Sequence, residues 1–192
     1  HGATLAFAKR HKIVRDGWNG FNVTHFAAAR MGGLMLGYAH DGGIKALAAQ
    51  KPEFDAALAA NDELKIDDLA DAGNGWALLH RGQTRLSSQD FSQQQGGFED
   101  MEAAAEKGLA EAQFWLGTKM AYGQDGYPLK PNSGLMMMER AARQGNTQAI
   151  MAVGLMYEQD SFMADKKKAR EWYERGAALG SDDAKKALER LD

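Results

Sequence analysis

Hydrophobic positions in the last third of the chain follow the spacing of amphipathic helices. After Asn146, apolar or small residues recur at intervals of three and four in two runs: Ala149, Ala152, Val153, Met156 and Tyr157, then Ala169, Trp172, Tyr173, Gly176 and Ala177. Each run predicts a helix with one buried face. Asn146 and Asp165 stand where N-caps are expected, and Gly180 stands where a left-handed residue ends the second helix.

This two-helix pattern repeats along the sequence. Three alanine-rich segments end in a glycine, at spacings of 37 and 35 residues: Gly108, Gly145 and Gly180. A second landmark, an alanine with a glycine five residues later, recurs after 37 residues: Ala112 to Gly117 and Ala149 to Gly154. A degenerate copy starts at Gly75, and a half copy contains Ala184 and Leu188. The predicted fold class is all-α: an α-solenoid of helix-turn-helix repeats, preceded by a mostly helical or irregular N-terminal segment.

The repeat pattern begins at about residue 73 and so divides the sequence into two parts. Residues 73–192 are predicted to form the solenoid, with repeats at about 75–108, 112–145 and 149–180 and a charged cap at 181–192. Residues 1–72 lack the period. We expect them to pack against the first repeat or against a larger partner.

The repeats resemble the Sel-one-like (Sel1-like) repeat family, which is related to tetratricopeptide repeats. The matching residues are Ala149, Val153, Gly154, Tyr157, Ala169, Trp172, Tyr173, Ala177 and Gly180, with Ala112, Leu116, Gly117, Gly134, Ala141, Ala142 and Gly145 in the preceding repeat. The first repeat departs from the family: His80 replaces a glycine, and Gly97 and Asp100 replace the usual Ala and Trp. The stretch 158–162 lacks the inter-helix glycine. The resemblance implies adaptor or regulatory work through protein–protein contacts.

Residues 11–70 resemble a different protein, the large iron–sulfur subunit of NADH–quinone oxidoreductase, complex I. The run from Arg15 to Tyr38, RDGWNGFNVTHFAAARMGGLMLGY, carries this resemblance. The stretch from Lys51 to Leu64 stands where that family has a buried strand, although Asp55 and several alanines argue against a buried strand here. The resemblance implies a structural role, because the sequence lacks the cluster-binding cysteines. A natural fusion, an engineered fusion and a degenerate first repeat are alternative origins for this segment.

The amino-acid composition excludes several kinds of site and partner. The 192 residues include no cysteine, which excludes disulfides, thiolate metal sites and cysteine nucleophiles. A reducing compartment, the cytoplasm or the mitochondrial matrix, fits this composition, and a disulfide-free periplasmic protein would look the same. The formal net charge of −3 offers no basic field for nucleic acid. No apolar run approaches the roughly 18 residues of a membrane span, so we expect a soluble protein.

No pattern of catalytic or cofactor-binding residues emerges. The five histidines show no compact metal-ligand spacing: His1, His11, His25, His40 and His80. The glycine pairs 32–33 and 42–43 and the GNG at 73–75 lack a Walker lysine, so we interpret them as turns. Core packing is expected for two of the three methionines at 136–138, and a solvated face for the basic cluster at 166–170. We predict a non-enzymatic protein without cofactor or metal.

The predicted function is therefore that of an interaction scaffold or adaptor, which binds another protein or a peptide. First helices of successive repeats line the concave face of a solenoid. Residues on those helices that we expect to be exposed are the candidate partner contacts: Gln113, Lys119, Tyr122, Gln148 and Glu158. Tyr122 is the first choice, because large amphipathic side chains are enriched at interfaces. The alternative is an accessory or fragment subunit of a respiratory NADH dehydrogenase, docked on respiratory complex subunits through residues 11–70.

Overall fold

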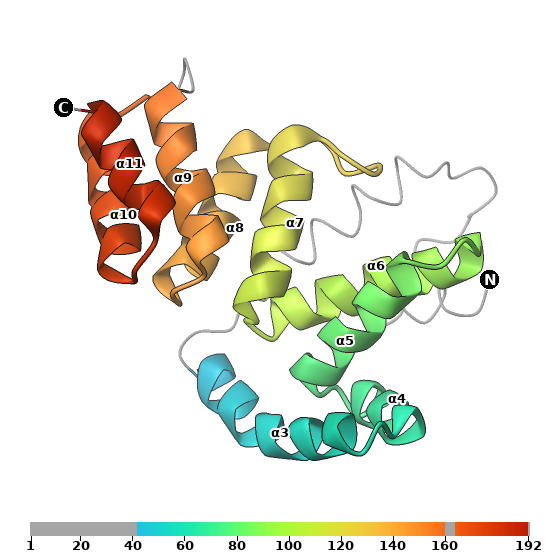
Figure 1. The fold of residues 1–192 in the computed structure, drawn as a ribbon. Helices are drawn as coiled ribbons and strands as arrows, with labels where there is room; N and C mark the ends of the chain where they lie inside the picture. The colour runs from blue at the N-terminus through green and yellow to red at the C-terminus, as the bar shows by residue number, and fades with distance from the viewer. Residues whose placement is uncertain (1–41, 160–163, 192) are drawn as a thin grey trace.

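The computed structural model describes residues 42–159 and 164–191, and nine helices fill these ranges (Figure 1). They are α3 (Gly42–Ala59), α4 (Glu63–Asp71), α5 (Gly75–Leu86), α6 (Phe91–Glu106), α7 (Ala110–Tyr122), α8 (Pro131–Arg143), α9 (Thr147–Gln159), α10 (Lys166–Ala178) and α11 (Asp182–Leu191). Each helix packs mainly on its neighbours in sequence, so that α5–α6, α7–α8 and α9–α10 form the repeats. The predicted all-α solenoid is confirmed. None of the described helices is long and apolar enough to cross a membrane.

Side-chain caps and left-handed glycines set the helix ends, as the sequence predicts. Asn146 Oδ1 accepts a hydrogen bond from the Ala149 amide at 2.8 Å. Asp165 Oδ1 accepts from the amides of Lys167 and Lys168, each at 3.1 Å. The glycine after each repeat has a positive φ, between 89° and 98°, which L side chains rarely adopt: Gly108, Gly145 and Gly180.

Backbone contact between paired helices is closest where two glycines face each other. A Cβ atom placed on Gly134 of α8 would lie 2.5 Å from the amide nitrogen of Ala121 and 2.6 Å from the carbonyl oxygen of Gly117, both on α7. Gly97 makes the matching contact in the first repeat, where its Cβ would lie 2.9 Å from the Leu86 nitrogen and 3.0 Å from the Gly82 oxygen. Gly97 stands 37 residues before Gly134, whereas Gly82 stands 35 before Gly117. The helices of the first repeat therefore cross two residues out of register with those of the second.

The helices before the first repeat share its core. Leu47 and Phe54 of α3 and Ile66 and Leu69 of α4 are buried in one cluster with side chains of α5, α6 and α7. The Trp76 indole donates to the Leu47 carbonyl at 2.9 Å. In the described part of the N-terminal segment, the two helices α3 and α4 pack on the first repeat. The domain boundary at residue 73 stays a prediction, since one core spans it.

Helix also occupies the stretch where the complex I subunit has a strand. Residues 51–59 belong to α3, and Asn61, with φ of 53°, leads into α4. Gly42 and Gly43 lie in the first turn of α3, so our interpretation of this pair as a turn was wrong. The start of a helix tolerates glycine better than the helix interior does. The other glycine pair, at 32–33, and residues 11–41 of the resemblance lie outside the described residues.

An ion network occupies the site where the family has a tryptophan. Asp100 on α6 is buried, and its two oxygens accept hydrogen bonds from Arg81 Nε and Nη2, both at 2.9 Å, and from Arg85 Nη1 at 2.7 Å. Burial acts to lower the pKa of Arg81, but its hydrogen bonds to Asp100 and Asp71 outweigh burial and raise that pKa above its ordinary value. The network ties α4, α5 and α6 together.

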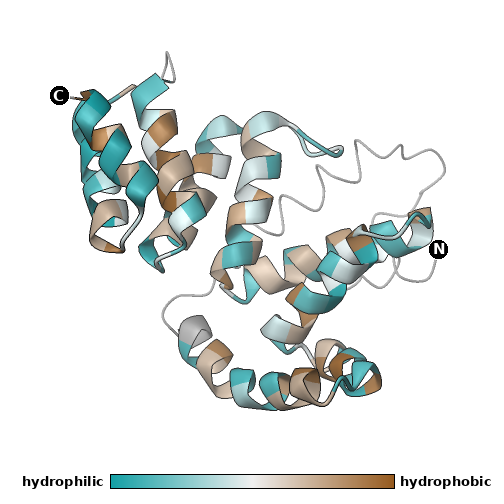
Figure 2. Ribbon diagram, viewed as in Figure 1, coloured by the Kyte–Doolittle hydropathy of each residue, from teal (hydrophilic) through white to brown (hydrophobic). Residues whose placement is uncertain are grey.

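Hydropathy changes along the solenoid (Figure 2). Most buried residues of α8, with those of α9 and α10, form a second core cluster together with Ala121 of α7 and two alanines of α11, whereas Met137 of α8 belongs to the first cluster. Of the methionine run, Met137 and Met138 are buried and Met136 is exposed, as expected. Hydrophilic residues cover much of α10 and α11 in this view, which agrees with the charged cap predicted for residues 181–192.

The helix crossing at Gly134 gives the first testable prediction. The substitution Gly134→Ala forces a methyl group into the α7 backbone, and we expect it to lower the free energy of unfolding by about 3 kcal/mol. Gly96→Ala is the matched control within a helix, because its Cβ would meet only the end of the Arg85 side chain, at 3.3 Å. Alanine's higher helix propensity should keep that change within about 1 kcal/mol of the parent. Urea denaturation monitored by circular dichroism measures the free energy of unfolding of both variants. Equal losses of stability in the two would contradict the backbone contact.

Candidate partner-binding surface

An apolar groove of about 400 Å³ opens where α5, α6, α7 and α9 meet. Its floor consists of large apolar side chains from three of these helices: Leu86, Met101, Phe114 and Trp115. Polar side chains form its rim: Gln83, Glu111, Thr118, Lys119 and Gln148. Trp115 packs on the first core cluster and Phe114 on the second. The groove thus lies over the boundary between the two cores.

Aromatic neighbours hold Trp115 in place. The Trp115 ring lies 5.8 Å from Phe98 and 6.2 Å from Tyr127 between ring centroids, and meets Tyr127 edge-on at 89°. The Tyr127 hydroxyl donates a short hydrogen bond to the buried Glu102 carboxylate. Because both supporting rings come from other elements, the indole is fixed before any partner arrives, which reduces the entropy lost on binding.

The rim of the groove carries both signs of charge. Gln83 Nε2 donates to Glu111 Oε1 at 2.6 Å, so that Glu111 is tied to α5. Lys119 Nζ lies 2.6 Å from Asp125 Oδ2 and 5.7 Å from the centroid of the Trp115 ring. Glu111 and Lys119 are two helical turns apart, about 12 Å along α7.

The predicted contact residues divide into three groups. Lys119 and Gln148 line the groove. Tyr122 is 56% exposed at the end of α7, one turn beyond Thr118, outside the groove lining. No observation tests any of these three as a partner contact, so they stay predictions.

Gln113 is not exposed, and its expected exposure was wrong. It is only 4% accessible, and its Oε1 accepts from Gln144 Nε2 at 2.9 Å. Its position explains this, since Gln113, Leu116 and Met120 fall on one buried stripe at the i, i+3, i+7 spacing. The same spacing was visible in the sequence. Gln113 links α7 to the end of α8 and has no surface to offer a partner.

Glu158 is also largely enclosed, with 13% of its side chain exposed. Arg190 of α11 donates to it through Nε at 3.0 Å and Nη2 at 2.6 Å, and the Tyr173 hydroxyl donates at 2.7 Å. The Arg190 hydrogen bond is the main cause that lowers the pKa of Glu158, against an opposing effect of burial. Burial, and then the bond to Glu158, raises the pKa of Tyr173. The expected exposure of Glu158 was wrong because Arg190, 32 residues away, covers it.

Sequence reasoning missed most of the groove floor. Trp115 was not among the predicted contacts, and nothing in the spacing singles out Leu86, Met101 or Phe114, which come from three different helices. His80, the histidine within the described ranges, packs 5.9 Å from the Phe54 ring. No group of three or more potential metal ligands occurs in residues 42–159 and 164–191.

The Glu158 cluster predicts a pH-dependent contribution to stability. A lowered folded pKa means that the carboxylate stabilises the fold fully above its unfolded value of about 4.3 and loses that effect as the pH falls through the folded pKa. At neutral pH we expect a lower Tm for Glu158→Gln than for the parent, with the gap shrinking in acid below about pH 4.3. Thermal melts at a series of pH values measure this difference in Tm. Glu174→Gln is the control, because Glu174 is exposed. A gap that stays constant with pH would refute the ionic contribution.

Comparison with known structures places the protein in a family. The Sel1 repeat protein from Oxalobacter formigenes aligns with 31% identity and a TM-score of 0.61, over 67% of this chain and 98% of that chain. A second match is c5321, a protective antigen present in uropathogenic Escherichia coli strains, which displays an SLR (Sel1-like repeat) fold. It aligns with 18% identity and a TM-score of 0.58. That alignment covers 88% of this chain and 36% of c5321.

The remaining comparisons found no further relatives of this chain. No protein-family model and no curated protein matches the sequence, and the resemblance of residues 11–70 to the large iron–sulfur subunit of complex I receives no support. The extent and identity of the first alignment are sufficient: this chain belongs to the Sel1 repeat family.

Proposed function

We propose that this protein is a non-catalytic interaction module that binds a short segment of a protein partner in the groove between α5, α6, α7 and α9. The observation that carries the proposal is the floor of the groove, where Trp115 and Phe114 stay partly exposed although each packs on a core cluster. Apolar pockets with a polar rim are the usual anchor sites of peptide-binding surfaces.

The size of the groove suits a segment rather than a folded domain. A volume of about 400 Å³ lies in the range of sites that enclose drug-sized groups. We therefore expect one or two apolar anchor residues of the partner to enter it. The opposite charges of Glu111 and Lys119 favour one orientation of the bound segment, because a reversed segment would place like charges together.

The same proposal accounts for the adaptor role expected of repeat solenoids. First helices of successive repeats, α5, α7 and α9, all contribute to the groove lining. The alternative role as an accessory subunit of respiratory complex I has no observation in its favour among the described residues.

Selection from a random peptide library on the purified full-length protein, followed by fluorescence polarisation, tests the proposal. We expect the selected peptides to carry apolar anchors. Gln148→Trp, which places a large side chain over the groove at an exposed position, should weaken their binding about tenfold, as loss of a central anchor contact does.

The adjacent Thr147→Trp is the matched control, since Thr147 is exposed on the same turn but does not line the groove. Its binding should stay within about twofold of the parent. Peptides that bind both variants equally, or a selection that yields no binder, would refute a peptide-binding groove at this place.

A further inference from the structure

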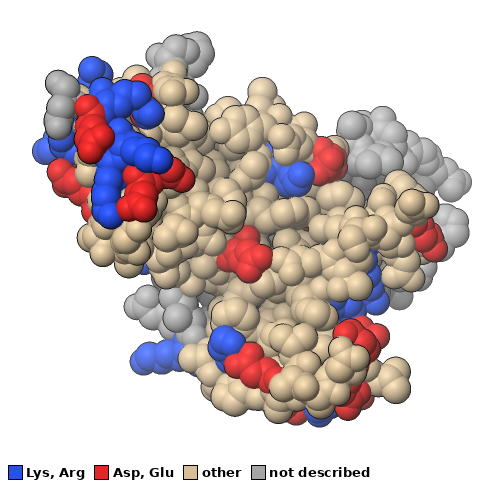
Figure 3. Space-filling model, viewed as in Figure 1, with Lys and Arg blue, Asp and Glu red and all other residues tan. Residues whose placement is uncertain are grey.

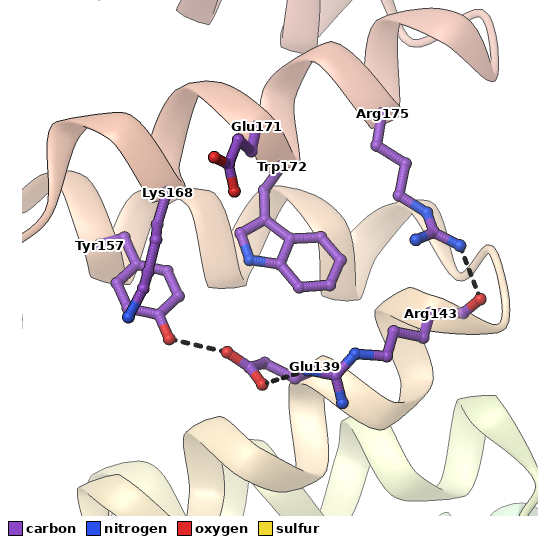
Figure 4. A pocket seen from close by; sticks show the side chains of 7 residues that line it. All are labelled: Glu139, Arg143, Tyr157, Lys168, Glu171, Trp172 and Arg175. Atoms are coloured by element: carbon purple, nitrogen blue, oxygen red, sulfur yellow. Dashed lines mark hydrogen bonds and ion pairs between the residues drawn. The ribbon is translucent and has the colours of Figure 1, made fainter.

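A second cleft, of about 500 Å³, lies between the second helices of the last two repeats (Figure 4). Glu139 and Arg143 of α8 line one side, Tyr157 of α9 lies at one end, and α10 supplies the other side through Lys168, Glu171, Trp172 and Arg175. No lining residue is shared with the groove over Trp115.

Trp172 forms a flat wall of the cleft with a cation on either side. Lys168 and Arg175 stand four residues before and three after it, and Figure 4 shows the indole between them. The Arg175 guanidinium lies 5.9 Å from the centre of the Trp172 ring, and its Nη2 donates to the Arg143 carbonyl at 2.8 Å. Lys168 Nζ lies 5.0 Å from the centre of the Tyr157 ring. These contacts hold both cations at the cleft, on residues that stand about 10 Å apart along α10.

The inner carboxylate of the cleft is already engaged. Glu139 Oε1 accepts from the Tyr157 hydroxyl at 2.7 Å, and Oε2 accepts from Arg143 Nη2 at 2.8 Å. Burial, and then the bond to Glu139, raises the pKa of Tyr157 to about 12, so the hydroxyl remains a donor at neutral pH. Arg143 offsets the charge of Glu139. Two further carboxylates accompany the cations: Glu171 lines the exposed rim, and Asp165 Oδ2 lies 3.8 Å from Lys168 Nζ.

The surroundings strengthen the positive character of the cleft. α8 and α10 together carry seven basic and three acidic side chains, although the whole protein has a net charge of −3. Figure 3 shows basic side chains gathered with acidic ones at this end of the molecule. A local field opposite in sign to that of the whole protein attracts anionic partners and raises their rate of association.

We propose that this cleft binds an acidic segment of a protein partner, with two carboxylates on Lys168 and Arg175 and the intervening chain over the Trp172 ring. Lys168 and Arg175 stand at a spacing along α10 close to that of acidic residues three apart in a polyproline II segment, which advances about 9 Å in three residues. Guanidinium and ammonium groups bind carboxylates through charge-assisted hydrogen bonds. This site goes beyond the proposed groove and does not depend on it.

Two synthetic peptides and the full-length protein test this inference. One probe is acetyl-Glu-Pro-Ala-Glu-Tyr-amide, and the other has glutamine in place of both glutamates. Nuclear magnetic resonance of the tryptophan indole groups reports on both sites at once, with the Trp172 signal assigned through Trp172→Phe. We expect the acidic peptide to shift the Trp172 signal saturably, to lose affinity as salt is raised, and to leave the Trp115 signal unchanged.

Charge variants sharpen the test. Lys168→Gln and Arg175→Gln should each weaken binding about threefold, as expected of exposed charge pairs, and Glu171→Gln should strengthen it by a similar factor. Lys186→Gln is the control, because Lys186 is an exposed lysine on α11 that does not line the cleft. Thermal melts of the variants should match the parent, so that lost binding reports on the cleft and not on the fold.

Three results would overturn the inference. The glutamine peptide could shift the Trp172 signal as strongly as the acidic one, the Trp172 signal could fail to move with either, or a single-stranded oligonucleotide could bind the cleft more tightly than the acidic peptide. None of these affects the groove proposal, whose failure would appear instead as peptides insensitive to Gln148→Trp.

Discussion

The backbone-to-backbone approach of α7 and α8 at Gly117 and Gly134 is the contact on which the arrangement of the repeats depends. With no Cβ between the two helices, their backbones approach closely and their large side chains lie to either side of the crossing. Leu116 and Met120 are buried in the first core cluster with the preceding repeat, and Met138 is buried in the second cluster with the following one. Each helix pair thereby buries its apolar face only when its neighbours are present, which makes the solenoid one continuous structure.

Departures from the repeat pattern decide where the groove opens. In the first repeat the helix crossing is displaced by two residues, and the Asp100 network replaces an aromatic side chain. Leu86 at the end of α5 reaches the groove floor, whereas its structural equivalent in the second repeat, 35 positions later, is the small Ala121, which is buried in the second core cluster. The next junction along the solenoid therefore lacks an equivalent floor. A buried carboxylate with two arginines is costly to desolvate, so the Asp100 network is weak evidence for added stability.

How far the sequence predicted this structure depends on the range of the interactions. Helices, caps and left-handed glycines were predictable, because Asn146, Asp165 and Gly180 act within four residues of themselves. Glu158 was misjudged because Arg190, 32 residues away, encloses it. Gln113 was misjudged although its spacing with Leu116 and Met120 already placed it on the buried stripe of α7. Lys119 and Gln148 were placed on the correct helices by the repeat register. The apolar floor beneath them could not be found, since it needs three helices to be positioned in space.

α9 links the two proposed sites. Gln148 near its start lines the groove, and Tyr157 near its end lines the charged cleft, nine residues and about 14 Å further along the helix. The residue after Tyr157 is Glu158, which fastens α11 through Arg190. Because the groove is lined mainly by first helices and the cleft mainly by second helices, the two surfaces belong to different layers of the solenoid. Two segments bound there would not compete for space, which is the geometry that an adaptor requires: one rigid helix reaches the rim of the apolar groove near one end and the charged cleft near the other.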